Sequence, residues 1–148
     1  MTIGITCGSF DLCHAGHMLM FKEAKEYCNY LIVMLQVDPS VTGSEYRGKK
    51  KNAPIMTLKE RAIILEGIRY IDEIIVYTDE PDLYKKLKET VHTVRILGED
   101  WKDKYATGQE FAKKIIYNTR KHNYSSTELR QRIYNEEHTK FDKNKLSL

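Results

Sequence analysis

The chain has 148 residues, of which 41% are hydrophobic and 30% are charged, and this composition is typical of one globular domain. The net charge of +3 is too small to indicate a nucleic-acid binder, and no run approaches the roughly 20 apolar residues that span a bilayer. The three cysteines form no CxxC pair and the N-terminus shows no leader pattern, so we expect a cytoplasmic protein without membrane insertion, disulfide framework or zinc site.

Strand and helix patterns alternate along the chain. Short β-rich or wholly apolar runs predict strands at 3–7, 30–37, 71–77, 94–97 and 114–118. Helical spacing and capping signals predict helices at 15–28, 57–70, 81–91 and from 125 onward. This alternation predicts an α/β fold, a Rossmann-like doubly wound five-stranded parallel sheet in the order 3-2-1-4-5. We expect one domain over 1–135 and a polar C-terminal tail over 136–148 that frays.

Ligands of such sheets bind beyond the carboxyl ends of the strands. This rule selects four segments for ligand binding, namely 8–17, 38–54, 98–104 and 119–127. The second of them is a long loop whose positive charge is concentrated in Arg47, Lys49, Lys50 and Lys51. A basic run of this kind is either a solvated loop or a cationic flap that closes on bound anions.

The segment after the first predicted strand reads Gly-Ser-Phe-Asp-Leu-Cys-His-Ala-Gly-His over 8–17. Gly8 lets a phosphate approach the backbone, and the helix start that follows offers free N–H groups to an anion. Two histidines around Gly16 can both point at one phosphate. The ten residues resemble the G-x-F-D-x-x-H-x-G-H signature of the cytidylyltransferase family in the HxGH nucleotidyltransferase superfamily.

The resemblance covers most of the chain. Residues 61–73 resemble the family's helix and R-Y-V-D-E segment, Leu97–Trp101 resembles its G-D-D-W segment with Glu99 in place of an aspartate, and Tyr124–Arg130 resembles its I-S-S/T-T-x-L/I-R signature. It implies a catalytic set of His14, His17, Lys51 and Arg120. The nucleotide-binding set that it implies is Gly8, Ser9, Phe10, Asp11, Gly16, Tyr124, Ser125, Ser126 and Thr127.

The acceptor-binding residues implied by the resemblance are Lys49, Arg61, Asp100 and Trp101. Two of them have an ordinary alternative: Arg61 can form a surface ion pair, and a lone tryptophan such as Trp101 usually belongs to a core or an interface. Asp11 could equally be an acid in the first turn of a helix. The family members that use glycerol 3-phosphate carry a lysine where this chain has Thr78, so a different phosphorylated alcohol, a phosphoamine or a sugar phosphate remains an alternative.

These observations predict an enzyme that transfers CMP from CTP to a small phosphorylated metabolite, glycerol 3-phosphate or similar, and releases pyrophosphate for envelope-polymer or lipid-precursor synthesis. Residues 121–123 depart from the family pattern, so an adenylyltransferase using ATP is the alternative, and a nucleotide-binding module without catalysis is a third. Mg²⁺ is expected to accompany the triphosphate without a protein cage. The resemblance also implies a homodimer, paired through the segment 69–72.

Overall fold

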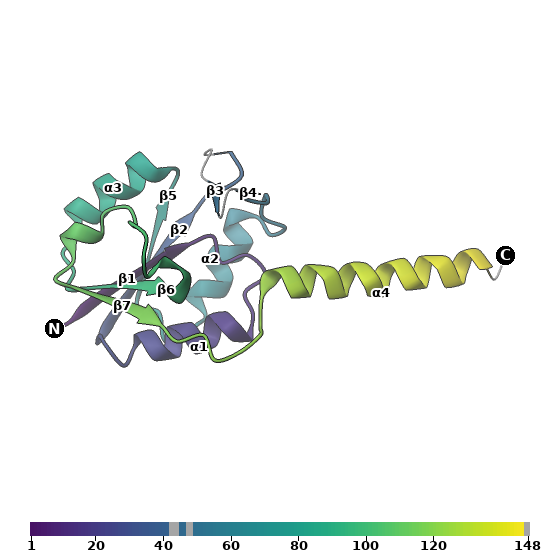
Figure 1. The fold of residues 1–148 in the computed structure, drawn as a ribbon, viewed down its shortest axis with the longest axis horizontal. Coiled ribbons are helices and arrows are strands. Elements are labelled where there is room, and N and C mark those ends of the chain that lie inside the picture. The colour runs from purple at the N-terminus through teal and green to yellow at the C-terminus, as the bar shows by residue number, and fades with distance from the viewer. Residues whose placement is uncertain (42–44, 47–48, 147–148) are drawn as a thin grey trace.

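The computed structural model describes residues 1–41, 45–46 and 49–146, with backbone alone at 45–46, 49–50 and 144–146. Its centre is a five-stranded parallel sheet built from β1 (Ile3–Gly8), β2 (Tyr30–Gln36), β5 (Glu73–Tyr77), β6 (Val94–Gly98) and β7 (Lys114–Asn118). The strand order is β5-β2-β1-β6-β7, which confirms the predicted order 3-2-1-4-5 (Figure 1). A separate antiparallel pair, β3 (Glu45–Tyr46) and β4 (Lys49–Lys50), interrupts the predicted loop.

Helices cover both faces of the sheet because its central strands are apolar on both sides. On one face, Phe21 of α1 (Ala15–Ala24) and Leu65 of α2 (Leu58–Glu66) pack with Leu31, Val33 and Leu35. On the other face, Leu83 and Leu87 of α3 (Glu80–Glu89) pack with Ile5, Ile32 and Met34. The 3-10 turns η1 (Glu99–Trp101) and η2 (Gln109–Phe111) lie between β6 and β7.

Two predicted helices end earlier than the sequence suggested. In α1 the chain leaves the helix after Ala24 through a tighter turn, in which the amides of Glu26 and Tyr27 reach only three residues back. In α2 the helix stops before Gly67, a residue that costs backbone entropy inside a helix. Its predicted start is confirmed, since Thr57 and Glu60 form a reciprocal capping box.

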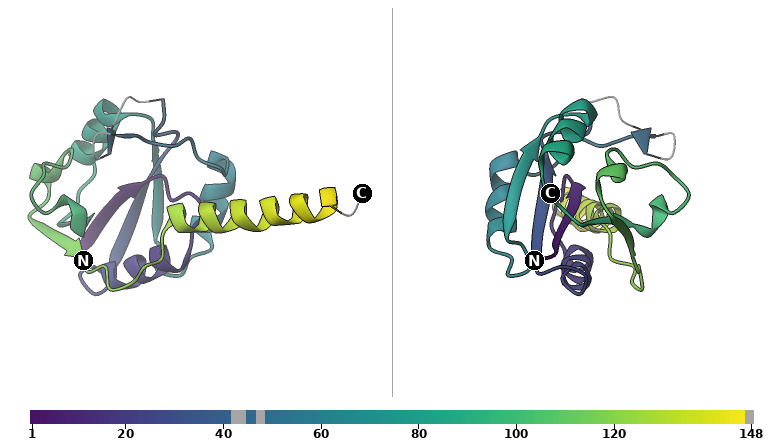
Figure 2. Two further views of the ribbon diagram at one scale, coloured as in Figure 1. Left: turned by 45° about the vertical axis from the view of Figure 1, so that its right-hand side comes forward. Right: turned by 90° about the vertical axis from the view of Figure 1, so that its left-hand side faces the viewer.

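The C-terminal segment is helical where fraying was expected. The last helix, α4 (Ser126–Leu146), continues through the predicted polar tail and projects away from the body of the domain (Figures 1 and 2). Ion pairs three or four residues apart support it, among them Arg132 with Glu128 and Lys140 with Glu137. Within the described ranges, no helix is long and apolar enough to cross a membrane.

Candidate active site

The turn between β1 and α1 holds an unusual backbone. Phe10 and Leu12 both have φ values of 49°, in the left-handed region that non-glycine residues seldom occupy. A side chain at Gly8 would meet the Phe10 ring at 3.3 Å, so the ring folds back over the end of β1. Phe10 is itself buried against Phe21 and the edge of His17. Strain of this kind persists where surrounding packing enforces it, and it concentrates at functional sites.

The two histidines form the N-terminal cap of α1. The Nδ1 atom of His14 accepts a hydrogen bond from the amide of Gly16 at 3.0 Å, and Nδ1 of His17 accepts from the amide of His14 at 3.2 Å. Because a backbone N–H always donates, neither Nδ1 atom carries a proton in these bonds. Each neutral ring therefore keeps its proton on Nε2, where it is a hydrogen-bond donor.

The surroundings favour the neutral rings. Burial lowers the pKa of His17 to about 4, with a further decrease from His14 and a small opposing effect of Asp11. Burial also lowers the pKa of His14, with His122 and Arg120 acting in the same direction. At neutral pH the site thus presents two Nε2–H donors without placing two positive charges 4.0 Å apart, the distance between the ring centroids.

His122 completes this corner, although the sequence did not single it out. Its Nδ1 accepts from the amide of Tyr124 at 3.1 Å, and its ring stacks on that tyrosine. A Cβ on Gly16 would lie 2.8 Å from Cε1 of His122 and 2.9 Å from Cε1 of His14. Any larger residue at 16 would displace one of the two imidazole rings that pack against the helix start.

Asp11 ties three segments together. Its carboxylate accepts hydrogen bonds from the amides of Ile55 and Met56 at 2.8 and 2.9 Å, and it pairs with Arg130 of α4 at 3.3 Å. Its carbonyl accepts from the Ser126 hydroxyl at 3.3 Å. The alternative of an acid in the first turn of α1 is wrong, since that turn contains no acidic residue. Asp11 instead fixes the basic loop and the start of α4 against the β1 turn.

Arg61 does not have the surface position expected for an ion pair. The residue is only 2% exposed, so a surface ion pair is wrong. Its guanidinium donates to four carbonyl oxygens, those of Ser9, Gln36, Val37 and Met56, at 2.5 to 3.2 Å. These bonds take up most of its donors and brace the ends of β1 and β2, and the side chain does not line the cleft described below. The acceptor-binding role that the resemblance implies for Arg61 stays a prediction.

The start of α4 presents a second helix N-terminus to the site. Ser125 caps it, accepting a hydrogen bond from the Glu128 amide at 3.1 Å. Ser126, Thr127 and Arg130 follow and line the same cleft as His17. A helix start combines free N–H groups with the positive end of the helix dipole, which suits a phosphate. Two helix N-termini, those of α1 and α4, thus meet at one place.

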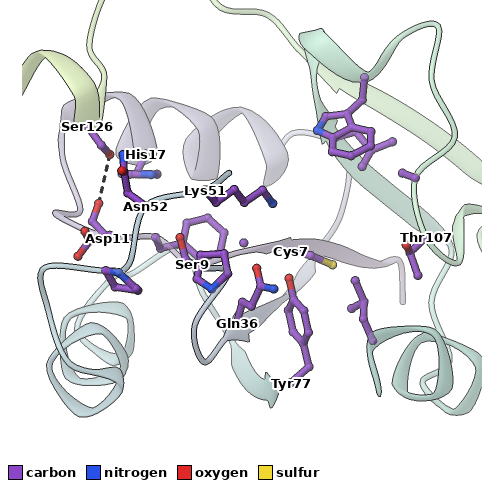
Figure 3. Close-up of a pocket in the computed structure, with 18 of the residues that line it drawn as sticks. Cys7, Ser9, Asp11, His17, Gln36, Lys51, Asn52, Tyr77, Thr107 and Ser126 are labelled. Carbon is purple, nitrogen blue, oxygen red and sulfur yellow. Dashed lines mark hydrogen bonds between the residues drawn. The ribbon is translucent and has the colours of Figure 1, made fainter. Parts of the chain in front are cut away.

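A cleft of about 970 Å³ joins these elements at the carboxyl ends of the strands (Figure 3). At its α4 end lie His17, Asp11 and Ser126, and at its α3 end lie Cys7, Tyr77 and Thr107. Lys51 extends into the space between the two ends (Figure 3). The other lining residues are Gly8, Ser9, Phe10, Gln36, Pro39, Asn52, Pro54, Glu80, Leu83, Arg95, Leu97, Trp101, Ala106, Thr127 and Arg130.

Comparison with known proteins fits this geometry. The family model described as cytidylyltransferase-like matches residues 5–132. The chain belongs to the cytidylyltransferase-like family. It is 30% identical over 132 residues to glycerol-3-phosphate cytidylyltransferase of Bacillus subtilis, covering 87% of this chain and 95% of that protein. It is 32% identical over 114 residues to the bifunctional protein HldE of Helicobacter hepaticus, covering 77% of this chain and 23% of that protein.

A solved structure has a similar fold. The lipopolysaccharide core biosynthesis protein from Thermoplasma volcanium superposes with a TM-score of 0.64 at 23% identity, over 82% of this chain and 99% of that one. At this identity the likeness shows the fold alone. Family membership makes the chain a nucleotidyltransferase.

The remaining residues of the predicted site lie in the lining of the cleft, outside it, or outside the described residues. Arg120 and Tyr124 are exposed beside His14, and Arg120 donates to the Tyr124 carbonyl at 3.4 Å. Trp101 lines the cleft, whereas Asp100 is exposed and is not among the lining residues. Arg47 and the side chains of Lys49 and Lys50 lie outside the described residues.

Sequence reasoning missed several lining residues. Arg130 ends the quoted Tyr124–Arg130 segment, so its position was readable but no role was given to it. Gln36, Glu80 and Arg95 carried no motif at all and are identified only by the geometry. The parts of the chain that the structure describes contain no group of three or more His, Cys, Asp or Glu residues that could hold a metal ion.

Proposed function

We propose that the protein transfers CMP from CTP to a small phosphorylated metabolite, glycerol 3-phosphate or similar, and releases pyrophosphate. The observation that carries this proposal is the single cleft in which His17, Lys51 and the start of α4 converge. A neutral N–H donor, a lysine and a helix N-terminus in one space suit two anionic substrates. The 30% identity to a glycerol-3-phosphate cytidylyltransferase over most of both chains supports the choice of reaction. The product would be an activated precursor for an envelope polymer or lipid.

The chemistry is an in-line displacement at the α-phosphorus. An oxygen of the acceptor phosphate forms a bond to that phosphorus, the bond to the bridging α–β oxygen breaks, and pyrophosphate leaves with the electron pair. A phosphate is already an adequate nucleophile, so the site needs no strong base. Its work is to position the two substrates and to stabilise charge.

The residues divide this work by their positions. The Nε2–H groups of His14 and His17 donate to the α-phosphate oxygens as negative charge develops. The start of α4, with Ser126 and Thr127, binds the β- and γ-phosphates. Arg120 stands beside His14 and neutralises the leaving pyrophosphate. Lys51 reaches between the two substrates.

The nucleotide set and the acceptor set extend this assignment. Gly8, Ser9, Phe10 and Asp11 shape the turn against which the nucleotide lies, and Tyr124 and Ser125 border it next to His14. Trp101 contacts the acceptor from the lining of the cleft. Lys49 and Asp100 are the further proposed acceptor contacts.

Magnesium would arrive with the triphosphate. Asp11, the carboxylate that opposes the lowering of the His17 pKa, is already engaged with two amides and Arg130. The site therefore fits a cation that the triphosphate itself ligates, and it does not fit a protein-held ion. The cation adds charge neutralisation on the phosphates. Excess chelator should abolish turnover, and full activity in chelator would refute this part of the proposal.

The choice of base rests on the 121–123 segment. His122 occupies the corner at Gly16 and stacks on Tyr124, which is a departure from the family pattern. An altered corner beside His14 is the one observation that favours ATP as an alternative nucleotide. CTP remains our choice because the family model and the full-length relatives are cytidylyltransferases.

We further propose a cytoplasmic homodimer. All three cysteines are free, in agreement with a reducing compartment. The expected pairing segment 69–72 presents Arg69 stacked over Tyr70, while Asp72 is held internally by Lys25 and the Leu31 amide. Light scattering on the purified chain tests the dimer, and a monomer at assay concentrations would refute it.

One experiment tests the reaction directly. Pyrophosphate release is measured with each of the four nucleoside triphosphates against a panel of phosphorylated metabolites. We expect release with CTP and an acceptor together, and none with either alone. Release that is independent of any acceptor, or with no triphosphate at all, would contradict the proposed function.

A further inference from the structure

The α3 end of the cleft carries polar side chains that the proposed reaction has not used. They are Gln36, Tyr77, Glu80, Arg95 and Thr107. Gln36 and Tyr77 are register partners at the carboxyl ends of β2 and β5, and Figure 3 shows both pointing into the cleft. Below them the same face of the sheet is apolar. The polar groups therefore form a distinct floor at this end of the cleft.

Two donors in this floor are buried without a partner. Nε2 of Gln36 and Nε of Arg95 make no hydrogen bond within the described part of the chain, and the two residues are only 2% and 3% exposed. Buried polar atoms are almost always hydrogen-bonded, since leaving one unpaired is costly. Both residues line the cleft, so a ligand there can supply the missing acceptors.

Opposite charges flank the same space. Thr107 connects them: its hydroxyl donates to Glu80 at 2.5 Å, and its carbonyl accepts from Nη1 of Arg95 at 2.8 Å. Both charges are felt at Cys7, whose pKa is raised by burial, lowered by Arg95 and raised by Glu80. Burial also raises the pKa of Tyr77, so that its hydroxyl stays protonated. The floor thus offers donors and acceptors with no net charge.

In-line geometry decides which substrate reaches this end. The attacking and leaving oxygens lie on opposite sides of the α-phosphorus. With pyrophosphate leaving toward the start of α4, the acceptor phosphate must approach from the opposite side, past Lys51. The rest of the acceptor then lies over the floor formed by Gln36, Glu80 and Arg95.

Resting on the proposed function, we propose that the α3 end binds the hydroxyl-bearing part of the acceptor, which is a polyol or sugar phosphate. A hydroxyl can accept from Arg95 or Gln36 and donate to Glu80 at the same time. An ammonium group only donates, so both buried donors would stay unpaired and Arg95 would repel it. A second anionic group would meet Glu80. Phosphorylated amines are therefore excluded as the preferred acceptor.

The test compares acceptors and variants in the pyrophosphate assay. The panel is glycerol 3-phosphate, ribitol 5-phosphate, mannose 1-phosphate, phosphocholine and phosphoethanolamine. We expect kcat/KM for the best hydroxylated acceptor to exceed that for either amine at least about a hundredfold, because sites built for hydroxyl groups discriminate strongly. Glu80→Gln should raise the KM of that acceptor about tenfold or more, as for loss of a hydrogen bond to a charged group, and leave the nucleotide KM unchanged.

Glu89→Gln is the matched control, since it removes the same charge from the exposed end of the same helix. Should Glu80→Gln fail to fold, Gln36→Leu carries the same test. Preference for an amine, or a changed nucleotide KM in either variant, would overturn the inference and leave the proposed function standing. Absence of pyrophosphate release with every acceptor would overturn both.

Discussion

His14 serves two purposes that a substitution can separate. Its Nδ1 caps α1 by accepting from the Gly16 amide, and its Nε2–H is free to donate to substrate. Asparagine is among the best residues for an N-cap and its side-chain oxygen can accept from the same amide. It has no atom at the position of Nε2. His14→Asn should therefore keep the cap and remove the donor, whereas His14→Ala removes both.

The two substitutions should differ in their effect on stability and agree in their effect on turnover. Loss of the cap in His14→Ala should cost about 1 kcal/mol of unfolding free energy, which lowers Tm by roughly 3 °C for a domain of this length. His14→Asn should stay within a few tenths of a kcal/mol of the parent. Both variants should lose turnover about a hundredfold to a thousandfold, as when one preorganised donor is removed from a developing anion.

Two measurements on the parent protein, His14→Asn and His14→Ala test this prediction. Urea denaturation or calorimetry gives the stability order, and pyrophosphate release gives kcat. The reasoning is refuted if His14→Asn turns over like the parent, because the Nε2–H would then be dispensable. It is also refuted if His14→Asn is as unstable as His14→Ala, because the Nδ1 bond would then contribute nothing to the cap.

Four other substitutions test three separate parts of the structure. Burial lowers the pKa of His17 to about 4 in the folded protein, against 6.5 in the unfolded chain, so the unfolded chain binds more protons below pH 6.5 and stability falls as the pH decreases. This loss of stability should reach about 2 kcal/mol by pH 5. A His17→Gln variant with the same pH dependence of denaturation would contradict the prediction. Arg61→Met should remove the donor from four carbonyls, one in a buried hydrogen bond and three in partly buried ones, and lower the unfolding free energy by about 3 kcal/mol. A calorimetric loss under about 1 kcal/mol, roughly one ordinary hydrogen bond, would show that these bonds are dispensable. Lys51→Ala should lower kcat or raise the nucleotide KM while Lys49→Ala mainly raises the acceptor KM; unchanged steady-state constants in both would make the basic run a solvated loop.

Much of the fold was readable because it depends on pattern and topology. Wholly apolar strands alternating with capped helices determine a doubly wound sheet, and the position of the histidines after the first strand places them at its ligand-binding edge. The capping box at Thr57 was equally local, and its hydrogen bonds are those expected from the residue types. These features are decided by neighbours in the sequence.

Other features depend on contacts between distant segments and had no local signal. An arginine at the start of a helix reads as exposed, yet Arg61 is buried because Ser9, just after β1, and Gln36, at the end of β2, bring their carbonyls to it. Gln36 and Arg95 look like ordinary strand residues, and only their burial in the cleft, with Nε2 of Gln36 and Nε of Arg95 left unpaired, distinguishes them. The helical tail is a third case, since ion pairs along α4 outweigh the polar composition that suggested fraying.

The central claim is that the α-phosphate of CTP moves to a phosphorylated acceptor in this cleft. The most direct measurement uses two parallel incubations, one with CTP labelled at the α-phosphate and one with CTP labelled at the γ-phosphate. We predict that the α label appears in a new cytidine conjugate of the acceptor and the γ label in pyrophosphate, both suppressed in His14→Asn. An α label recovered only in free CMP, or left in CTP with every acceptor, would contradict the account.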